Sequence, residues 1–548
     1  MRTSNSLESM ERGRQRAVIE VVLPKIAASR YALKRTVGER VVVEADIFAD
    51  GHEALSAVLK YRLEKDEAWL EVAMIPLGSD CWRGEFEVRE PGVYCYTVAA
   101  WVDRFKTWRQ ALLNRIGAGE DLANEWLTGA GLIEAAVARA NPEDAARLRE
   151  AALVLRAREA VTQALLVQTA MDDALAETVT RCMDRNLVTT CEPELRVVVD
   201  PVLARFGAWY EMFSRSCARE PGRHGTFKDC EAELPRIAEM GFDVLYFPPI
   251  HPIGRTLRKG KNNQPVCQPG EPGSPWGIGA AEGGHKAVHP ELGTLEDFRQ
   301  LAARARELKI EIALDIAFLC SPDHPYVTEH LEWFRKRPDG SIQYAENPPK
   351  KYQDIFPFDF ECEDWRGLWR ELKSIFDFWI EQGVRVFRVD NPHTKAFTFW
   401  EWCFAELKRE HPELIFLAEA FTRPTVKYHL ARLGFTQSYN YFPWRNTRDE
   451  LAEYLTELTR SSVAEFFRPN LWTNTPDILT QYLQHGERAA FMAGLILAAT
   501  LGASYWIYGP AFELCENRPR EPGSEEYLDS RNTRSSIGTW AGRRSFEI

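Results

Sequence analysis

Hydrophobic and polar positions alternate with a period of two in the first hundred residues. The runs 39–48, 82–88 and 92–102 have this pattern and are separated by turn residues. Because successive side chains of a strand point to opposite faces, the alternation predicts strands that each bury one face. We therefore expect an N-terminal β-sandwich over residues 18–106, after a disordered tail over residues 1–17.

The hydrophobic period becomes helical after about residue 107. Residues 109–183 are rich in Ala, Leu, Glu and Arg, and stretches such as 144–155 suit amphipathic helices. We predict a helical insertion over residues 107–190. A return strand and a linker are expected over residues 191–203.

Helical and strand-like patterns alternate repeatedly in the rest of the chain. Helices are predicted at 234–241, 294–308, 365–382 and 397–409, with Thr294 as an N-cap, and each precedes a short apolar run. This order indicates a parallel sheet covered by helices, and thus the α/β class. We expect a (β/α)8 barrel over residues 204–530, whose unusually long loop over residues 320–364 is typical of substrate sites.

Three carboxylates in the barrel region are candidates for catalysis. Asp390 and Glu419 each end a short apolar run, and Asp477 lies further along the chain. Barrels of this kind keep catalytic groups at the carboxyl ends of their strands. A nucleophile, an acid/base and a supporting carboxylate are what a retaining glycosyl transfer requires. A single carboxylate at a strand end is more often a loop or helix cap.

Composition and charge exclude several classes of function. The 548 residues are 45% hydrophobic and 27% charged, which is ordinary for a soluble globular protein. The formal net charge is −12 and the basic residues form no long block, so we expect no nucleic acid and no membrane as partner. The polar start and the absence of a run of 18 apolar residues predict a cytoplasmic protein.

The 11 cysteines are scattered without a Cys-x-x-Cys pair. In a reducing compartment this predicts free, buried thiols, and neither a disulfide framework nor a zinc site. No cluster of side chains has the spacing of metal ligands. We therefore expect no metal and no cofactor.

A series of short motifs runs through residues 195–530. They include Ala208-Trp-Tyr-Glu, Pro248-Pro-Ile-His-Pro-Ile-Gly, Arg258-Lys-Gly-Lys-Asn-Asn, Arg388-Val-Asp-Asn-Pro-His-Thr-Lys, Ala418-Glu-Ala-Phe-Thr-Arg-Pro and Asn474-Thr-Pro-Asp. In this order they resemble the motifs of the α-amylase superfamily, and specifically of its alpha-1,4-glucan:maltose-1-phosphate maltosyltransferase family. The sandwich and the helical insertion resemble the N-terminal domain of this family and its dimer-forming insert in organisation. The resemblance therefore implies a homodimer.

The resemblance also implies an activity. Members of the family transfer a maltosyl unit from α-maltose 1-phosphate to the non-reducing end of an α-1,4-glucan, with release of phosphate and retention of the anomeric configuration. By motif, Asp390 is implied as the nucleophile that forms a covalent glycosyl intermediate. Glu419 is implied as the acid and then the base, and Asp477 as the carboxylate that holds sugar hydroxyls.

Substrate-binding residues follow from the same motifs. Arg388 precedes Asp390 by two residues and so lies on the same face of the strand, where its charge keeps Asp390 ionised. The resemblance implies that Asn391 and His393 bind the reacting sugar. It implies phosphate binding, which needs cationic and hydrogen-bonding groups, by Lys259, Asn263 and Tyr352.

The sequence departs from the family at two places. Leu319 stands where the family has an amide side chain, which removes a polar contact expected near the sugar. After Ser530 the sequence leaves the family pattern, and one choice of codons read in another frame restores a family-like continuation. We hypothesise a frameshift there. Residues 531–548 are then an off-family tail, and part of the phosphate clasp, the C-terminal β-domain and the last barrel elements are expected to be missing.

Two other readings stay open from the sequence. An α-glucan hydrolase or another transglycosylase uses the same three carboxylates. The other alternative is not an enzyme: the chain would be a truncated, inactive remnant that binds glucan or forms dimers. Release of phosphate from maltose 1-phosphate separates the transferase from both.

Overall fold

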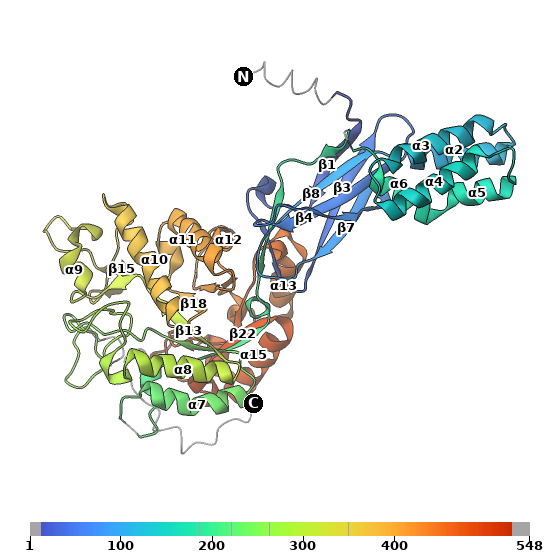
Figure 1. The fold of residues 1–548 in the computed structure, drawn as a ribbon. Coiled ribbons are helices and arrows are strands. Elements are labelled where there is room, and N and C mark those ends of the chain that lie inside the picture. The colour runs from blue at the N-terminus through green and yellow to red at the C-terminus, as the bar shows by residue number, and fades with distance from the viewer. Residues whose placement is uncertain (1–12, 186, 221, 262–263, 349, 529–548) are drawn as a thin grey trace. The chain divides into compact units, whose positions relative to one another are not determined.

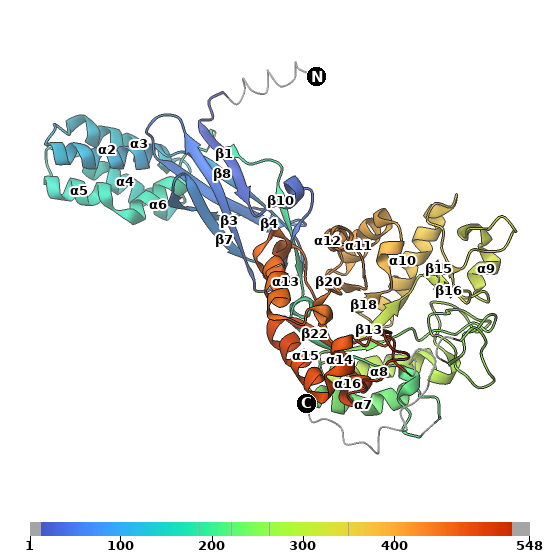
Figure 2. The same cartoon turned by 180° about the vertical axis from the view of Figure 1, so that it is seen from behind.

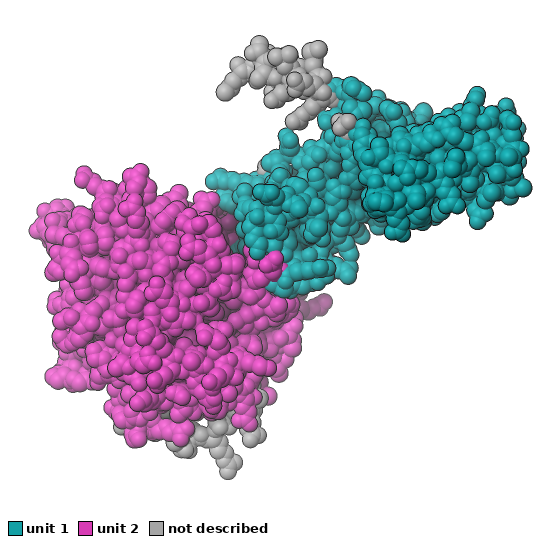
Figure 3. All heavy atoms as spheres, viewed as in Figure 1, with its two compact units in different colours: residues 1–89, 93–199 teal, residues 90–92, 200–548 magenta. Residues whose placement is uncertain are grey.

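A computed structural model describes residues 13–185, 187–220, 222–261, 264–348 and 350–528. Two compact units are found, one of residues 1–89 and 93–199 and one of residues 90–92 and 200–548 (Figure 3). Most of the predicted N-terminal tail and all of the tail over 531–548 lie outside the described residues.

The first unit contains two antiparallel sheets. One sheet has the order β1 (Ala17–Leu23), β3 (Arg40–Ala49), β7 (Cys81–Glu87), β6 (Ile75–Gly78). The other has the order β2 (Leu33–Thr36), β10 (Leu195–Asp200), β8 (Gly92–Val102), β4 (Leu55–Leu63), β5 (Leu70–Ala73), with β9 (Thr189–Thr190) paired to β8. Phe86 of the first sheet stacks on Tyr61 of the second with ring centroids 4.3 Å apart, so the sheets face each other as a sandwich.

Five helices lie between β8 and β9 in the chain and belong to the same unit. They are α2 (Arg104–Ala118), α3 (Ala123–Val137), α4 (Pro142–Arg156), α5 (Gln163–Met171) and α6 (Asp173–Cys182). Their inward faces form a separate apolar cluster that includes Trp108, Trp126 and Leu148. Asp103 caps α2 by accepting a hydrogen bond from the Lys106 backbone nitrogen at 2.9 Å.

The second unit is an eight-stranded parallel barrel. In the order of the ring its strands are β11 (Gly207–Glu211), β12 (Val244–Phe247), β13 (Glu311–Ile316), β18 (Val386–Val389), β19 (Ile415–Ala418), β20 (Gln437–Ser438), β21 (Leu471–Trp472) and β22 (Ser504–Tyr508). β22 pairs with both β11 and β21.

The ring closes between β20 and the segment that enters β21. The Ser438 nitrogen donates to the Arg468 carbonyl oxygen at 3.0 Å, and the Asn470 nitrogen donates to the Ser438 carbonyl oxygen at 3.0 Å. The predicted (β/α)8 class is therefore confirmed. The expectation that the last barrel elements are missing is wrong for the strands, because all eight lie before residue 509. Of the described residues after β22, only Gly509–Glu513 are helical.

Helices surround the strands (Figures 1 and 2). They are α7 (Phe227–Glu239), α8 (Leu295–Glu307), α10 (Trp365–Glu381), α11 (Phe397–Glu410), α12 (Pro424–Leu433), α13 (Arg448–Arg460) and α15 (Glu487–Leu501), with the short α14 (Gln481–His485) and α16 (Gly509–Glu513). Thr294 caps α8 as predicted, in a capping box with Asp297. α7 begins earlier than predicted because Thr226 and Asp229 form a second capping box.

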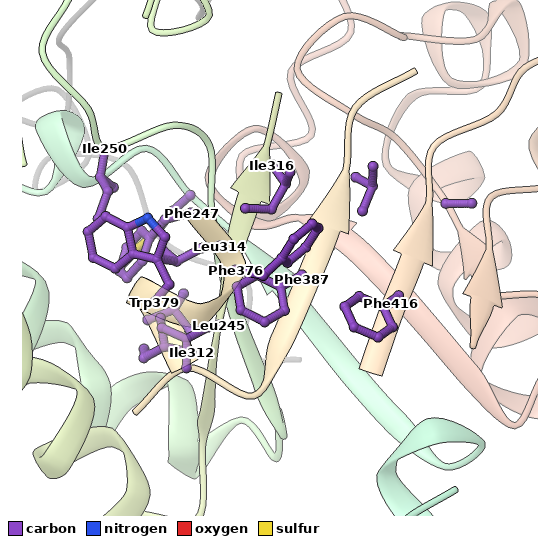
Figure 4. Close-up of a cluster of buried hydrophobic side chains, with 14 of the residues drawn as sticks. Leu245, Phe247, Ile250, Ile312, Leu314, Ile316, Phe376, Trp379, Phe387 and Phe416 are labelled. Atoms are coloured by element: carbon purple, nitrogen blue, oxygen red, sulfur yellow. The ribbon is translucent and has the colours of Figure 1, made fainter. Parts of the chain in front are cut away.

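Side chains of the strands fill two cores. Outward-facing residues such as Leu245, Leu314, Phe387 and Phe416 pack against helices, and Phe376 of α10 lies among them (Figure 4). Inward-facing residues form an aromatic-rich interior of Trp209, Tyr246, Tyr439, Trp472 and Trp506. The filled interior leaves the loops at the carboxyl ends of the strands to form a site.

The predicted long loop carries secondary structure of its own. It contains α9 (Pro325–Glu329), β15 (Ala345–Asn347), β16 (Lys350–Tyr352) and β17 (Phe356–Pro357), and it begins with β14 (Leu319–Cys320). β14 pairs with β17, and β15 pairs with β16, both antiparallel. None of the helices in the described part of the chain is long and apolar enough to cross a membrane.

Candidate active site

A pocket of about 1030 Å³ lies where the barrel loops meet the long loop. Asp390, Glu419 and Asp477 all line it, from the segments that follow β18, β19 and β21. The structure therefore brings the three predicted carboxylates to one cavity.

Arg388 holds the centre of the site together. Its Nη1 lies 2.9 Å from Asp390 Oδ1, and its Nη2 lies 2.9 Å from Glu419 Oε1. Nη1 also lies 2.9 Å from Asp315 Oδ2, in the barrel interior. With 7% of its side chain exposed, the guanidinium is a buried cation that links three carboxylates.

The surroundings shift the pKa values of the two candidate catalytic carboxylates, Asp390 and Glu419, in opposite directions. Burial acts to raise the pKa of Asp390, but the charges of Arg388 and Lys395 and the hydrogen bonds from Arg388 and Asn391 lower it below its ordinary value. Burial raises the pKa of Glu419 to about 8; Arg388 opposes this and the charge of Asp390 adds to it. An ionised Asp390 beside a protonated Glu419 follows from this arrangement.

Asn391 connects both carboxylates through a left-handed backbone conformation. Its φ is 41°, a value that asparagine tolerates better than most residues. Its backbone nitrogen donates to Glu419 Oε2 at 3.2 Å, and its Nδ2 donates to Asp390 Oδ2 at 3.3 Å. This turn thus orients the two side chains toward the same space.

A second group of polar residues lines the same pocket from the long loop. Lys350 and Tyr352 lie two positions apart on β16 and therefore on one face of the strand. Burial raises the pKa of the Tyr352 phenol; the charge of Lys350 opposes this and that of Asp477 adds to it. Asp477, Lys350 and Tyr352 thus share one electrostatic environment.

The other predicted binding residues are placed differently. His393 and Leu319 line the pocket, and the buried Nδ1 of His393 has no hydrogen-bond partner within the described residues. Lys259 does not line the pocket: its side chain is buried, and Nζ donates to Gln353 Oε1 at 2.8 Å. Asn263 lies outside the described residues.

Two further residues, not predicted from the sequence, support the candidate carboxylates Asp390 and Glu419. Asp315 is fully buried and accepts hydrogen bonds from Arg388 and, at 2.7 Å, from the Tyr246 hydroxyl. Burial raises the pKa of Asp315 to about 6, against the charge of Arg388. Lys395 is buried, and its Nζ donates to the Asp390 carbonyl oxygen at 3.3 Å. A charged residue inside an apolar strand run was the signal available for Asp315.

Among the residues that the structure describes, two clusters of side chains have donor atoms close enough for a metal ion, both outside the pocket lining. They are His285, Cys320 and His324, and His224, His289 and Glu291.

Hydrogen bonds already occupy the imidazoles of the first cluster. His285 Nε2 donates to the Ala317 carbonyl oxygen at 2.9 Å, and His324 Nδ1 accepts from the Tyr326 nitrogen at 3.0 Å. His324 Nε2 must then donate to His285 Nδ1, 3.0 Å away. Both rings are thus neutral and use all their nitrogens, which is the pattern of a structural cluster.

Comparison with known proteins connects the chain to one family. The model of the domain N/S of alpha-1,4-glucan:maltose-1-phosphate maltosyltransferase matches residues 15–201. An alpha-1,4-glucan:maltose-1-phosphate maltosyltransferase of Chlorobaculum tepidum is 52% identical over 94% of this chain and 77% of that protein. One of Methylacidiphilum infernorum is 51% identical over 96% of this chain and 78% of that protein.

Solved structures were compared as well. A crystal structure of an alpha-amylase from Lactobacillus plantarum is 21% identical with a TM-score of 0.45, and the match covers 62% of this chain and 78% of that one. The identity of about one half to the two maltosyltransferases extends over nearly the whole chain. The chain therefore belongs to the alpha-1,4-glucan:maltose-1-phosphate maltosyltransferase family.

Proposed function

We propose that this protein transfers a maltosyl unit from α-maltose 1-phosphate to the non-reducing end of an α-1,4-glucan and releases phosphate, with retention of configuration. The observation that carries the proposal is the contact of Arg388 with both Asp390 and Glu419, whose pKa values move in opposite directions. A double displacement needs this pairing of an ionised nucleophile with a protonated acid.

The first step uses Asp390 and Glu419 together. A carboxylate oxygen of Asp390 attacks the anomeric carbon while the bond from that carbon to the phosphate oxygen breaks. The proton of Glu419 goes to the departing phosphate. The product is a glycosyl ester of Asp390, and Glu419 is left as a carboxylate.

The second step reverses the roles. The 4-hydroxyl of the terminal glucose of the acceptor gives its proton to Glu419 and attacks the anomeric carbon, which releases Asp390. Asp477 holds sugar hydroxyls, and Asn391 and His393 contact the reacting sugar. Two inversions at the same carbon give net retention.

The phosphate group is proposed to lie toward β16. Tyr352 supplies a hydroxyl there, and Lys350, which also lines the pocket, supplies a positive charge. Lys259 is buried outside the pocket lining and supports this region by its hydrogen bond to Gln353, the residue after Tyr352. Asn263 stays a proposed phosphate ligand on the family motif alone.

Phosphate release from α-maltose 1-phosphate, with glycogen or a malto-oligosaccharide as acceptor, tests the proposal. We expect release by the wild-type chain and a loss of about a thousandfold or more in Asp390→Ala. Asp377→Ala, on α10 outside the pocket lining, is the matched control and keeps full activity. Cleavage of α-glucan without use of the phosphorylated donor would instead identify a hydrolase or another transglycosylase.

We also propose a cytoplasmic homodimer, with dimer contacts made by the helical segment over residues 107–190. The family organisation supports the dimer, and the composition supports the location. Sedimentation of the wild-type chain as a monomer at micromolar concentration would contradict the dimer. The proposed domains are the sandwich over 18–106, this insertion, the linker over 191–203 and the barrel over 204–530.

A further inference from the structure

Lys350 and Glu526 form an ion pair at the pocket. Lys350 Nζ, on β16, lies 2.9 Å from Glu526 Oε1, in the segment that follows α16. Both residues line the pocket, and their side chains are 61% and 38% exposed. The pair therefore joins two pocket walls that are 176 residues apart in sequence.

Glu526 has a second cationic partner in its own segment. Arg520 Nη1 lies 2.9 Å from Glu526 Oε2, and the Arg520 backbone nitrogen donates to the Glu526 carbonyl oxygen at 2.8 Å. A hydrogen bond from the Leu528 nitrogen to the Arg518 carbonyl oxygen, at 2.9 Å, extends this pairing. Because Arg520 remains beside it, the Glu526 carboxylate stays compensated when Lys350 moves away.

We propose that the Glu526 carboxylate competes with the phosphate of the donor for the Lys350 ammonium. Glu526 pairs with Lys350 when the phosphate site is empty, and the donor phosphate replaces Glu526 when it binds. The inference rests on the proposed function, since it assigns Lys350 to the phosphate. Exposed ion pairs are weak. A phosphate dianion carries more charge and more acceptor oxygens than a carboxylate, so it displaces Glu526 from Lys350.

The exchange has a consequence for turnover. After displacement the Glu526 carboxylate remains next to the bound phosphate and repels it. Phosphate set free in the first chemical step is therefore held less tightly than Lys350 alone would hold it. Glu526 acts as a positioning residue that limits phosphate affinity and favours phosphate departure.

Binding of inorganic phosphate to the full chain, measured by calorimetry, tests this competition without the need for catalysis. Glu526→Gln keeps the shape of the side chain and removes its charge, and we expect phosphate to bind about two- to fivefold more tightly. Arg520→Gln leaves Glu526 with Lys350 as its remaining cation, so phosphate is expected to bind more weakly. Glu516→Gln is the matched control, because Glu516 pairs with Arg518 in the same segment and does not line the pocket.

The same variants separate failure of this inference from failure of the proposed function. Donor KM is expected to fall in Glu526→Gln and to rise in Arg520→Gln, while KM for the uncharged acceptor stays constant. Unchanged or weaker phosphate binding by Glu526→Gln overturns the competition even when the wild type is an active transferase. Tighter binding by this variant supports the competition even when α-maltose 1-phosphate is not a substrate. Thermal unfolding followed by circular dichroism establishes that each variant is folded. The change in phosphate affinity expected for Arg520→Gln is opposite in sign to that expected for Glu526→Gln.

Discussion

Asp315 and Arg388 occupy paired positions on the neighbouring strands β13 and β18, and their side chains meet at 2.9 Å inside the barrel. Both side chains are nearly inaccessible to solvent. A buried cation is stable only with partners, so Asp315 anchors the arginine that also contacts Asp390 and Glu419, the two carboxylates proposed to react.

Removal of the Asp315 carboxylate is expected to destabilise the barrel. Asp315→Ala leaves Arg388 with less compensation and the Tyr246 hydroxyl without its acceptor, at a cost of about 3 kcal/mol in the free energy of unfolding. Urea unfolding followed by tryptophan fluorescence measures this cost. Asp315→Asn keeps an acceptor oxygen and is expected to lose less. A loss of under about 1 kcal/mol in the alanine variant would contradict the anchoring role.

The activity is expected to fall on the alkaline side because the acid must carry a proton. With the pKa of Glu419 at about 8 in the free protein, its protonated fraction and hence kcat/KM for the donor decrease above pH 8. Asp390, with its pKa below the ordinary range, stays ionised throughout neutral pH. The measurement is the pH profile of kcat/KM for the wild type and for Glu419→Gln.

Glu419→Gln is the control for ionisation of the donor, because the phosphate group of the donor itself titrates near pH 6 and so also changes the pH profile. We expect a residual rate at least about a hundredfold lower, without the alkaline decrease near pH 8. An alkaline limb that persists in Glu419→Gln would assign the limb to another group.

Buried histidines are expected to make the protein less stable in acid. Burial lowers the pKa of His251 to about 4 and that of His324 to about 3, against an ordinary value of about 6.5. Below pH 6.5 the unfolded chain therefore binds protons that the folded chain does not. Stability from each imidazole is present above pH 6.5 and decreases by about 1.4 kcal/mol per pH unit as the pH falls toward the folded value.

Urea unfolding at pH values between 7 and 5 measures this loss. His251→Gln is expected to lower the number of protons taken up on unfolding by about one, and so to reduce the slope of the unfolding free energy against pH. This holds whatever the effect of the substitution on stability at pH 7. Equal slopes for the wild type and His251→Gln would contradict the linkage.

Two glycines are expected to respond in opposite directions to alanine. A Cβ on Gly509 would lie 2.0 Å from the Tyr210 ring, whose hydroxyl is bound by Glu513 and Arg236, so the ring is held in place. Gly509→Ala is expected to cost about 1–3 kcal/mol. Gly494, in α15, has open space around its Cβ position, and Gly494→Ala is expected to stabilise by about 0.5–1 kcal/mol. Thermal unfolding compares the two, and a neutral Gly509→Ala would contradict the packing.

The parts of the fold that were predictable from the sequence are those marked by a hydrophobic period or by a helix-capping residue. Thr294 and the strand before Asp390 were predicted correctly because capping and apolar runs are local signals. β20 and β21 have two residues each, too few to display a period, so the sequence could not predict where the ring closes. The start of α7 was missed because its capping box precedes the apolar residues used to find the helix.

In the candidate site, contacts between residues close in the sequence were predictable, and contacts between distant segments were not. The spacing of Arg388 and Asp390 predicted their contact, because Arg388 lies in β18 and Asp390 directly follows this strand. The contact of Asp315 with Arg388 depends on the register between two strands separated by more than 70 residues. Both faces of these strands are buried, so their apolar pattern does not indicate which residues pair. The same limit applies to Lys350 and Glu526, which meet only because distant segments fold onto one pocket.

The two-residue strands at the closure of the ring have a mechanical consequence. Few hydrogen bonds join Ser438 to residues 468–470, whereas Asp390 and Glu419 follow β18 and β19, which pair with each other over four positions. Asp477 follows β21, on the other side of that join. A transient opening of the ring there would move Asp477 away from the other two carboxylates while leaving them aligned. The join between β20 and β21 therefore separates the residue proposed to hold the sugar from the pair proposed to break its bond.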